Sequence, residues 1–82
     1  MKLIALNLPR DFDEQALANL FKAHGNIKSC TIVMDEKTGK SKGFGFVEMA
    51  LAHEGEIAIK ELHGSRVESK SGREKIRVKA AD

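Results

Sequence analysis

Residues 42–49, with the sequence KGFGFVEM, place two aromatic rings and a cation on one side of a single extended strand. Side chains alternate between the two faces of a strand, so Lys42, Phe44 and Phe46 share one face and Val47 and Met49 share the other. Only the face with Val47 and Met49 needs a hydrophobic core. We therefore expect two of the four phenylalanines to lie on a solvated sheet surface beside a lysine, an arrangement suited to stacking flat rings and holding phosphates.

Strand and helix patterns alternate along the rest of the chain. Residues 3–8, 29–34 and 75–79 predict strands, and residues 37–40 predict the hairpin turn before the central segment. Asp13 is a good N-cap for a first helix that ends near residues 24–26, and its apolar stripe includes Leu17 and Phe21. In the second helix, Leu51, Ile57, Ala58 and Leu62 are expected on the buried side. Cys30, Ile32 and Met34 are expected on the core side of their strand, with Thr31 and Val33 opposite.

The order β-α-β-β-α-β with two amphipathic helices predicts an α+β, ferredoxin-like βαββαβ plait. A four-stranded antiparallel sheet has both helices on one face, and the first and third strands form its central pair. Strand parity places the following residues on the open face: Lys2, Ile4, Thr31, Val33, Phe44, Phe46, Lys75, Arg77 and Lys79.

The central octapeptide closely matches the pattern [K/R]-G-[F/Y]-[G/A]-F-V-x-[F/Y], and seven of its eight positions fit. The exception, Met49, faces the core, where a thioether fills space about as well as a ring. Residues 3–8 fall where a first-strand hexapeptide belongs, and the His63-Gly64 ending of the second helix fits as well. In this order of motifs, nearly the whole chain resembles the RNA recognition motif (RRM) family, and in particular its short, one-domain bacterial members.

The resemblance implies that Phe46 stacks a base, Phe44 packs against sugars and Lys42 meets phosphate. Asn7 could read base edges through its side-chain amide, and Arg77 and Lys79 could contact phosphates. The family usually offers Phe or Tyr where this chain has Ile4, so one stacking partner is missing and binding by the sheet alone is expected to be modest. Ile4 serves either as a base contact or as a cross-strand neighbour of the aromatic rings.

Length and charge limit the remaining possibilities. Eighty-two residues predict one domain, 1–82, too small for a deep catalytic cleft. The net charge is only +2, but residues 66–79 contain six basic residues against two acidic ones, which suits a polyanion on one surface. A lone cysteine fits a reducing compartment, and the first apolar stretch is too short for a signal peptide. We expect a cytoplasmic monomer that does not interact with a membrane.

Other chemistries lack their residue patterns. His24, His53 and His63 lack metal-ligand spacing with each other or with Cys30, and no cofactor is expected. Residues 39–41 resemble the end of a P-loop but lack its first glycine, and no nucleophile has an obvious base. The leading hypothesis is therefore single-stranded RNA binding with low sequence selectivity, with single-stranded DNA not excluded and a chaperone or post-transcriptional role possible. The alternatives are a protein-interaction module and, more distantly, an acyl-phosphate hydrolase with Arg10 as the cation of its phosphate loop.

Overall fold

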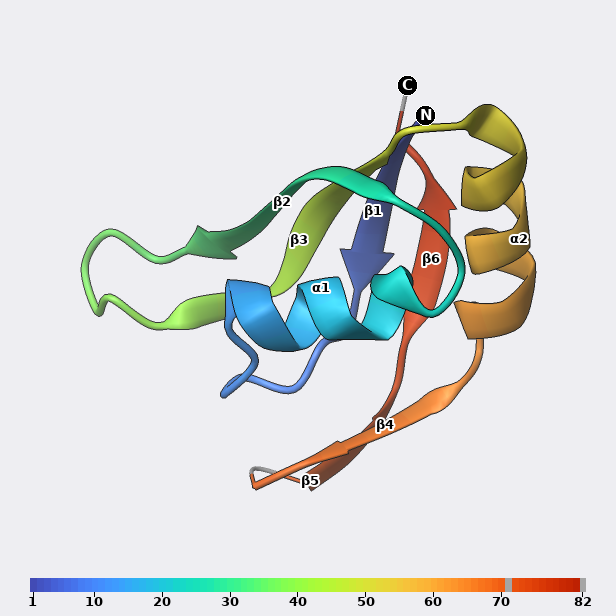
Figure 1. Ribbon diagram of the computed structural model, residues 1–82. Coiled ribbons are helices and arrows are strands. Elements are labelled where there is room, and N and C mark those ends of the chain that lie inside the picture. The colour runs from blue at the N-terminus through green and yellow to red at the C-terminus, as the bar shows by residue number, and fades with distance from the viewer. Residues whose placement is uncertain (71, 82) are drawn as a thin grey trace.

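The computed structural model describes residues 1–70 and 72–81 and contains the expected sheet with two helices on one face (Figure 1). The main sheet is formed by β1 (Lys2–Leu6), β2 (Ile27–Met34), β3 (Ser41–Met49) and β6 (Arg77–Ala80). The helices are α1 (Glu14–Lys22) and α2 (Ala52–Leu62), and a second sheet pairs β4 (Arg66–Ser69) with β5 (Gly72–Lys75). Neither helix in these ranges is long and apolar enough to cross a membrane.

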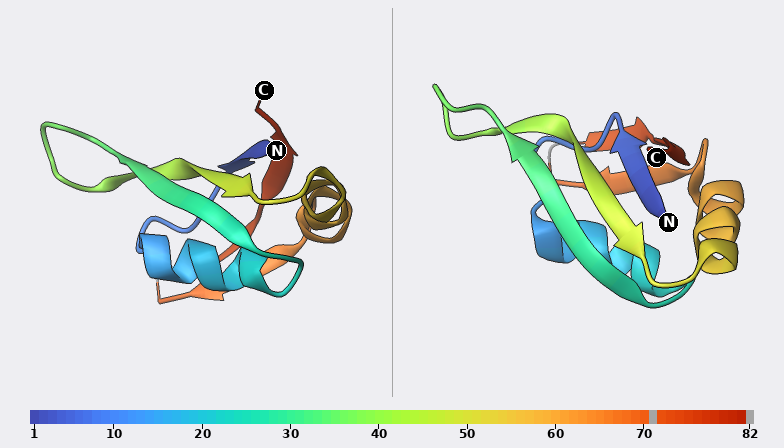
Figure 2. Two further views of the ribbon diagram at one scale, coloured as in Figure 1. Left: turned by 45° about the horizontal axis from the view of Figure 1, so that its top comes forward. Right: turned by 90° about the horizontal axis from the view of Figure 1, so that it is seen from above.

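The strands of the main sheet lie in the order β2-β3-β1-β6, all antiparallel. This order confirms that the first and third strands form the central pair. In the register of that pair, Ile4 lies opposite Phe46 and Leu6 lies opposite Phe44. The left view of Figure 2 shows α1 beneath the strands, and α2 lies beside β6.

The core lies between the sheet and the helices and follows the alternation of β3. Gly43, Gly45, Val47 and Met49 are buried, whereas the residues between them are only half-buried or exposed. Met49 is almost completely inaccessible, which confirms that its departure from the family pattern concerns packing. The other apolar side chains of the core come from every other element except β5: Leu3, Ala5, Leu8, Leu17, Phe21, Ile32, Ala58, Leu62, Val67, Ile76 and Val78.

The start of α1 is confirmed in detail. An oxygen of the Asp13 carboxylate accepts a hydrogen bond from the backbone N–H of Ala16 at 2.8 Å, which satisfies one of the free donors in the first turn. Leu17 and Phe21, one helical turn apart, are fully buried. The sequence pattern was sufficient here because both the cap and the apolar stripe are local features.

The predicted buried side of α2 is partly wrong. Ala58 and Leu62 are buried, but Leu51 and Ile57 are 49% and 46% exposed. The helix instead turns Gly55 inward, where a Cβ atom would lie only 2.6 Å from the Met1 sulfur. The chain's first residue thus packs closely against the helix at Gly55, and a glycine gives no hydrophobic signal that could reveal this.

Met34 was expected on the core side of β2, and the structure places it there, because it lies opposite the buried Ser41 and lines a pocket with Ile32 and Phe12. The register between β2 and β3 shifts between Ile32 and Met34, but two residues on β2 then span four on β3, so both side chains keep the same face. Met34 is nevertheless 49% exposed, since it ends an edge strand.

Lys75 was expected in the fourth strand of the main sheet, and this is also wrong. It ends β5, where it pairs with Arg66, and β6 begins only at Arg77. Between them, the Ile76 N–H donates to the Ser65 carbonyl at 2.9 Å, and the Ile76 carbonyl accepts from the Gly64 N–H at 2.8 Å. These bonds to the loop after α2 separate the two strands.

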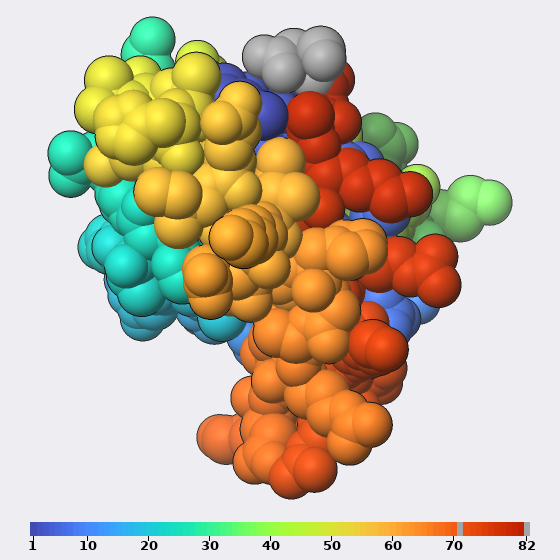
Figure 3. All heavy atoms as spheres, turned by 90° about the vertical axis from the view of Figure 1, so that its right-hand side faces the viewer, coloured from blue at the N-terminus to red at the C-terminus, as the bar shows by residue number. Residues whose placement is uncertain are grey.

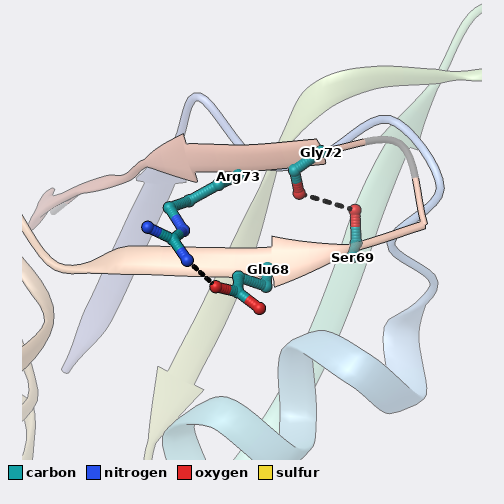
Figure 4. Close-up of polar contacts among 4 residues, drawn as sticks. All are labelled: Glu68, Ser69, Gly72 and Arg73. Atoms are coloured by element: carbon teal, nitrogen blue, oxygen red, sulfur yellow. Dashed lines mark hydrogen bonds and ion pairs between the residues drawn. The ribbon is translucent and has the colours of Figure 1, made fainter.

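The β4–β5 hairpin stands out as a lobe at the bottom of the molecule in Figure 3. Within it, Glu68 forms an ion pair with Arg73, and the Ser69 hydroxyl donates to the Gly72 carbonyl (Figure 4). The pairing offsets the charge of one basic residue in this segment.

Candidate nucleic-acid interface

Two phenylalanine rings occupy the centre of the sheet face opposite the helices. Phe44 and Phe46 are both half-buried, as expected for side chains that pack on the sheet surface but leave part of each ring uncovered. Their strand, β3, has β1 on one side and β2 on the other. The expectation that both rings lie on the open face is confirmed.

The rings meet edge to face, with their centroids 6.3 Å apart and their planes at 82°. The Lys2 ammonium lies 5.1 Å from the centroid of the Phe46 ring. A cation–π contact at an exposed site contributes about 0.5–1 kcal/mol, whereas a base stacked on an aromatic ring contributes about 1–3 kcal/mol. The ammonium is therefore held only weakly over the Phe46 ring, by less than a stacked base would contribute.

The neighbouring strands surround this pair with small or aliphatic side chains. Ile4 on β1 and Thr31 on β2 both lie opposite Phe46, one on each side. Ile4 and Val33 are half-buried, and Thr31 is exposed. The surface beside Phe46 is thus accessible, but it has no third flat ring.

Cations lie at the margins of the same face. Lys42 is exposed on β3, and Arg77 and Lys79 are exposed on β6, opposite Leu6 and Ile4. Glu48 also points to this face, and its carboxylate lies 3.9 Å from the Lys28 ammonium. The acid at this end of the sheet is therefore partly balanced by a local cation.

Asn7 has a structural contact that the sequence did not indicate. Its backbone adopts a left-handed conformation, with φ of 61°, at the end of β1. Its side-chain amide donates to the Lys75 carbonyl at 2.9 Å. This bond fixes the amide beside the end of β5 and uses one of its two N–H groups, so the group expected to read base edges is held in place.

A pocket of about 740 Å³ lies beside β6. His63, which follows α2, belongs to it. Nδ1 of His63 lies 3.1 Å from the backbone nitrogen of Val78 and 3.2 Å from its carbonyl oxygen, so the ring covers the outer edge of β6. The other residues that line this pocket are mainly polar or cationic: Leu6, Asn7, Gly64, Lys75, Ile76, Arg77 and Lys79.

The candidate groups for other chemistry are not assembled. Among residues 1–70 and 72–81, no three His, Cys, Asp or Glu side chains gather as metal ligands would. Cys30 is half-buried, and its thiol lies 3.6 Å from the Glu14 carbonyl oxygen. Burial raises the pKa of the Cys30 thiol, and the Glu14 carboxylate raises it further, which favours the unreactive protonated form.

Comparison with known proteins decides the family. Residues 6–73 match the family model of the RNA recognition motif. The chain belongs to the RRM family. A solved structure described as "SXL-LETHAL PROTEIN/RNA COMPLEX" superimposes on 99% of this RRM with a TM-score of 0.87 and 37% sequence identity, and 46% of that chain is covered.

The relatives of this RRM include plant ribonucleoproteins. It is 39% identical over 80 residues, 98% of its length, to the 29 kDa ribonucleoprotein B, chloroplastic, of Nicotiana sylvestris. It is 42% identical over 65 residues, 79% of its length, to the RNA-binding protein CP31B, chloroplastic, of Arabidopsis thaliana. The chain spans 26% and 22% of those two proteins. These relatives do not support the expected likeness to bacterial members in particular.

Proposed function

We propose that this RRM binds single-stranded RNA across the open face of its sheet. The observation that carries the proposal is the pair of half-buried rings, Phe44 and Phe46, at the centre of that face. Bases stack on such rings whatever their identity, and each stack contributes about 1–3 kcal/mol. A duplex hides the faces of its bases in its own stack, so an unpaired strand is the natural ligand.

The cations around the rings support the same proposal. Lys2, Lys42, Arg77 and Lys79 surround Phe44 and Phe46 and can neutralise phosphates on either side of a stacked base. Stacking and phosphate contacts carry little sequence information, so we propose low selectivity among bases. Ile4 in place of a third ring leads to modest affinity.

We also propose that the RRM binds RNA and does not catalyse a reaction. The open face offers flat apolar and cationic groups, and the Cys30 thiol is held in its unreactive form on the other side of the sheet. The relatives are described as RNA-binding proteins and ribonucleoproteins, of which this chain spans about a quarter. We propose a chaperone or post-transcriptional role for the RRM, in a reducing compartment such as the cytoplasm.

The test is a titration of the 15N-labelled protein with a short unstructured RNA and with DNA of the same sequence. Amide shifts should concentrate on β1, β3 and β6. Phe46→Ala should weaken binding by about 1–3 kcal/mol, roughly 5-fold to 100-fold. Raising the salt concentration should weaken binding with a slope near −0.7 for each phosphate contacted.

Leu51→Ala is the matched control, because it also removes an exposed apolar side chain but lies at the start of α2. It should leave RNA affinity unchanged. If the shifts instead cluster on α2, or if Phe46→Ala changes affinity by less than about 0.5 kcal/mol against the expected stacking term, the sheet is not the RNA-binding surface. Self-association through the aromatic face, without an RNA shift, would favour the protein-interaction alternative.

A further inference from the structure

A second pocket lies beside the aromatic face, where the β2–β3 hairpin leaves the sheet, and it has a volume of about 530 Å³. Phe44 is its one aromatic side chain, and its polar lining includes three cations, Arg10, Lys40 and Lys42, together with Asp35, Thr38 and Ser41. Arg10 comes from the loop between β1 and α1, so the pocket joins two segments that are distant in the sequence. In the sequence analysis, Arg10 had a role only in the distant enzyme alternative.

Arg10 is held at this place by the backbone of β3. Its guanidinium donates to the Ser41 carbonyl at 3.2 Å, and the Leu8 N–H donates to the Gly43 carbonyl at 2.7 Å, which fastens the loop to the strand. Gly43 has φ of 85°, and a Cβ atom there would lie only 3.0 Å from Nε of Arg10. The glycine of the octapeptide thus permits both the backbone conformation and the close approach of the guanidinium.

The pocket has an excess of positive charge. Its one carboxylate, that of Asp35, accepts the backbone N–H groups of Lys37 at 2.8 Å and Thr38 at 3.4 Å, and so serves the hairpin turn. A guanidinium carries five N–H donors, and the bond to Ser41 takes one of them. Planar N–H donors beside ammonium groups are suited to a phosphate.

The pocket is also continuous with the stacking surface, because Phe44 lines it and contacts Phe46 edge to face. The family resemblance already implies that Phe44 packs against sugars and Lys42 meets phosphate; we propose that Arg10 and Lys40 extend this surface toward the hairpin as additional phosphate contacts. This inference rests on the proposed RNA binding and deepens it. The RNA strand leaves the sheet over Phe44 toward the hairpin, so its footprint is longer than the aromatic pair alone.

The experiment compares Arg10→Gln with the unaltered protein on two unstructured RNAs, a trinucleotide and a heptanucleotide. The heptanucleotide should bind about 5-fold more weakly to the variant, the effect of one exposed charge-assisted contact. Its salt slope should fall in magnitude by about 0.7. The trinucleotide, which is covered by the aromatic pair, should lose less than 2-fold.

Lys22→Gln is the matched control, since it removes one exposed cation in the last turn of α1 on the helix side. It should change neither the affinity for the longer RNA nor the salt slope. Lys40→Gln tests the opposite wall of the pocket without touching the bond between Arg10 and Ser41, and it should reproduce the loss seen with Arg10→Gln. A preserved amide spectrum confirms folding of each variant.

The outcomes separate this inference from the proposed function. If Arg10→Gln and Lys40→Gln behave like Lys22→Gln while Phe46→Ala still weakens binding, the pocket is not part of the RNA path and sheet stacking stands. If Phe46→Ala is also without effect, both the proposed function and the pocket assignment are refuted. The phosphate contact is supported only if Arg10→Gln and Lys40→Gln both weaken binding of the heptanucleotide and leave binding of the trinucleotide nearly unchanged.

Discussion

Replacing Ile4 by phenylalanine should strengthen RNA binding, because it supplies the flat ring that the open face lacks. Ile4 lies on β1 directly opposite Phe46 and is half-buried on the open face. Side chains opposite each other in an antiparallel pair have Cβ atoms about 5 Å apart. A ring at this position would therefore stand beside Phe46 and present a second face to the next base.

The magnitude follows from the environment of the site. A further stacked base contributes about 1–3 kcal/mol, and the lower half of that range applies because Ile4 already covers a base by apolar contact. We expect binding about 5-fold to 30-fold tighter, on the scale of 1.4 kcal/mol for each factor of ten. The side chain projects away from the buried core, so the free energy of unfolding should change by less than about 1 kcal/mol.

The assay is fluorescence anisotropy with a labelled unstructured RNA, accompanied by urea unfolding of each variant. Ile4→Val is the control, since it keeps an aliphatic side chain at the same position and should not increase affinity. If Ile4→Phe folds normally and binds no more tightly than Ile4→Val, the missing ring does not limit affinity. The reasoning about stacking on this face would then be refuted.

Two further predictions concern elements outside the open face. Asp13→Ala removes the hydrogen bond to the Ala16 N–H and should lower the free energy of unfolding, measured with urea, by about 1 kcal/mol. Asp13→Asn should retain the hydrogen bond and the stability. Equal losses for both variants would contradict the capping role. Cys30 should be alkylated more slowly than a free cysteine near neutral pH, because its raised pKa leaves less thiolate. Glu14→Gln should lower that pKa and speed alkylation, and an unchanged rate would show that the carboxylate has no influence.

Most of the fold could be predicted because its signals are local. The alternation in β3 assigns Phe44 and Phe46 to one face and Val47 and Met49 to the other, and the structure agrees. The cap at Asp13 likewise depends on residues within one helical turn. These features need no knowledge of distant contacts, so pattern and propensity are enough.

The errors arise where distant backbone contacts decide. From Lys75 onward the sequence alternates as expected for a single strand. Only the hydrogen bonds between Ile76 and the loop after α2 divide this segment into the end of β5 and the start of β6. Met34 is exposed at the end of the edge strand β2, and Ile57 is exposed although Gly55 of the same helix packs closely against Met1. None of these contacts leaves a hydrophobic or charge pattern in the chain.

The site shows the same division. Parity and motif predicted Phe44, Phe46 and Lys42 on the open face, where the structure has them, whereas neither predicted that Arg10 and His63 would line pockets beside that face. The predicted topology did hint at the position of Arg10. The first and third strands were expected to be antiparallel neighbours, so residues that follow the first strand lie near the start of the third. It became informative only with the structure, where Arg10 bonds to β3.

The two glycines of the octapeptide explain how one strand can serve the core and the ligand at once. A Cβ atom on Gly45 would lie 2.5 Å from the Thr31 carbonyl oxygen and 3.0 Å from the Leu17 side chain, so this glycine lets β2 and α1 pack closely on the core side. Gly43, also on that side, lets Arg10 approach the strand. Because Val47 and Met49 on the other side of β3 fill the core, Phe44 and Phe46 are not needed there and stay partly uncovered on the open face.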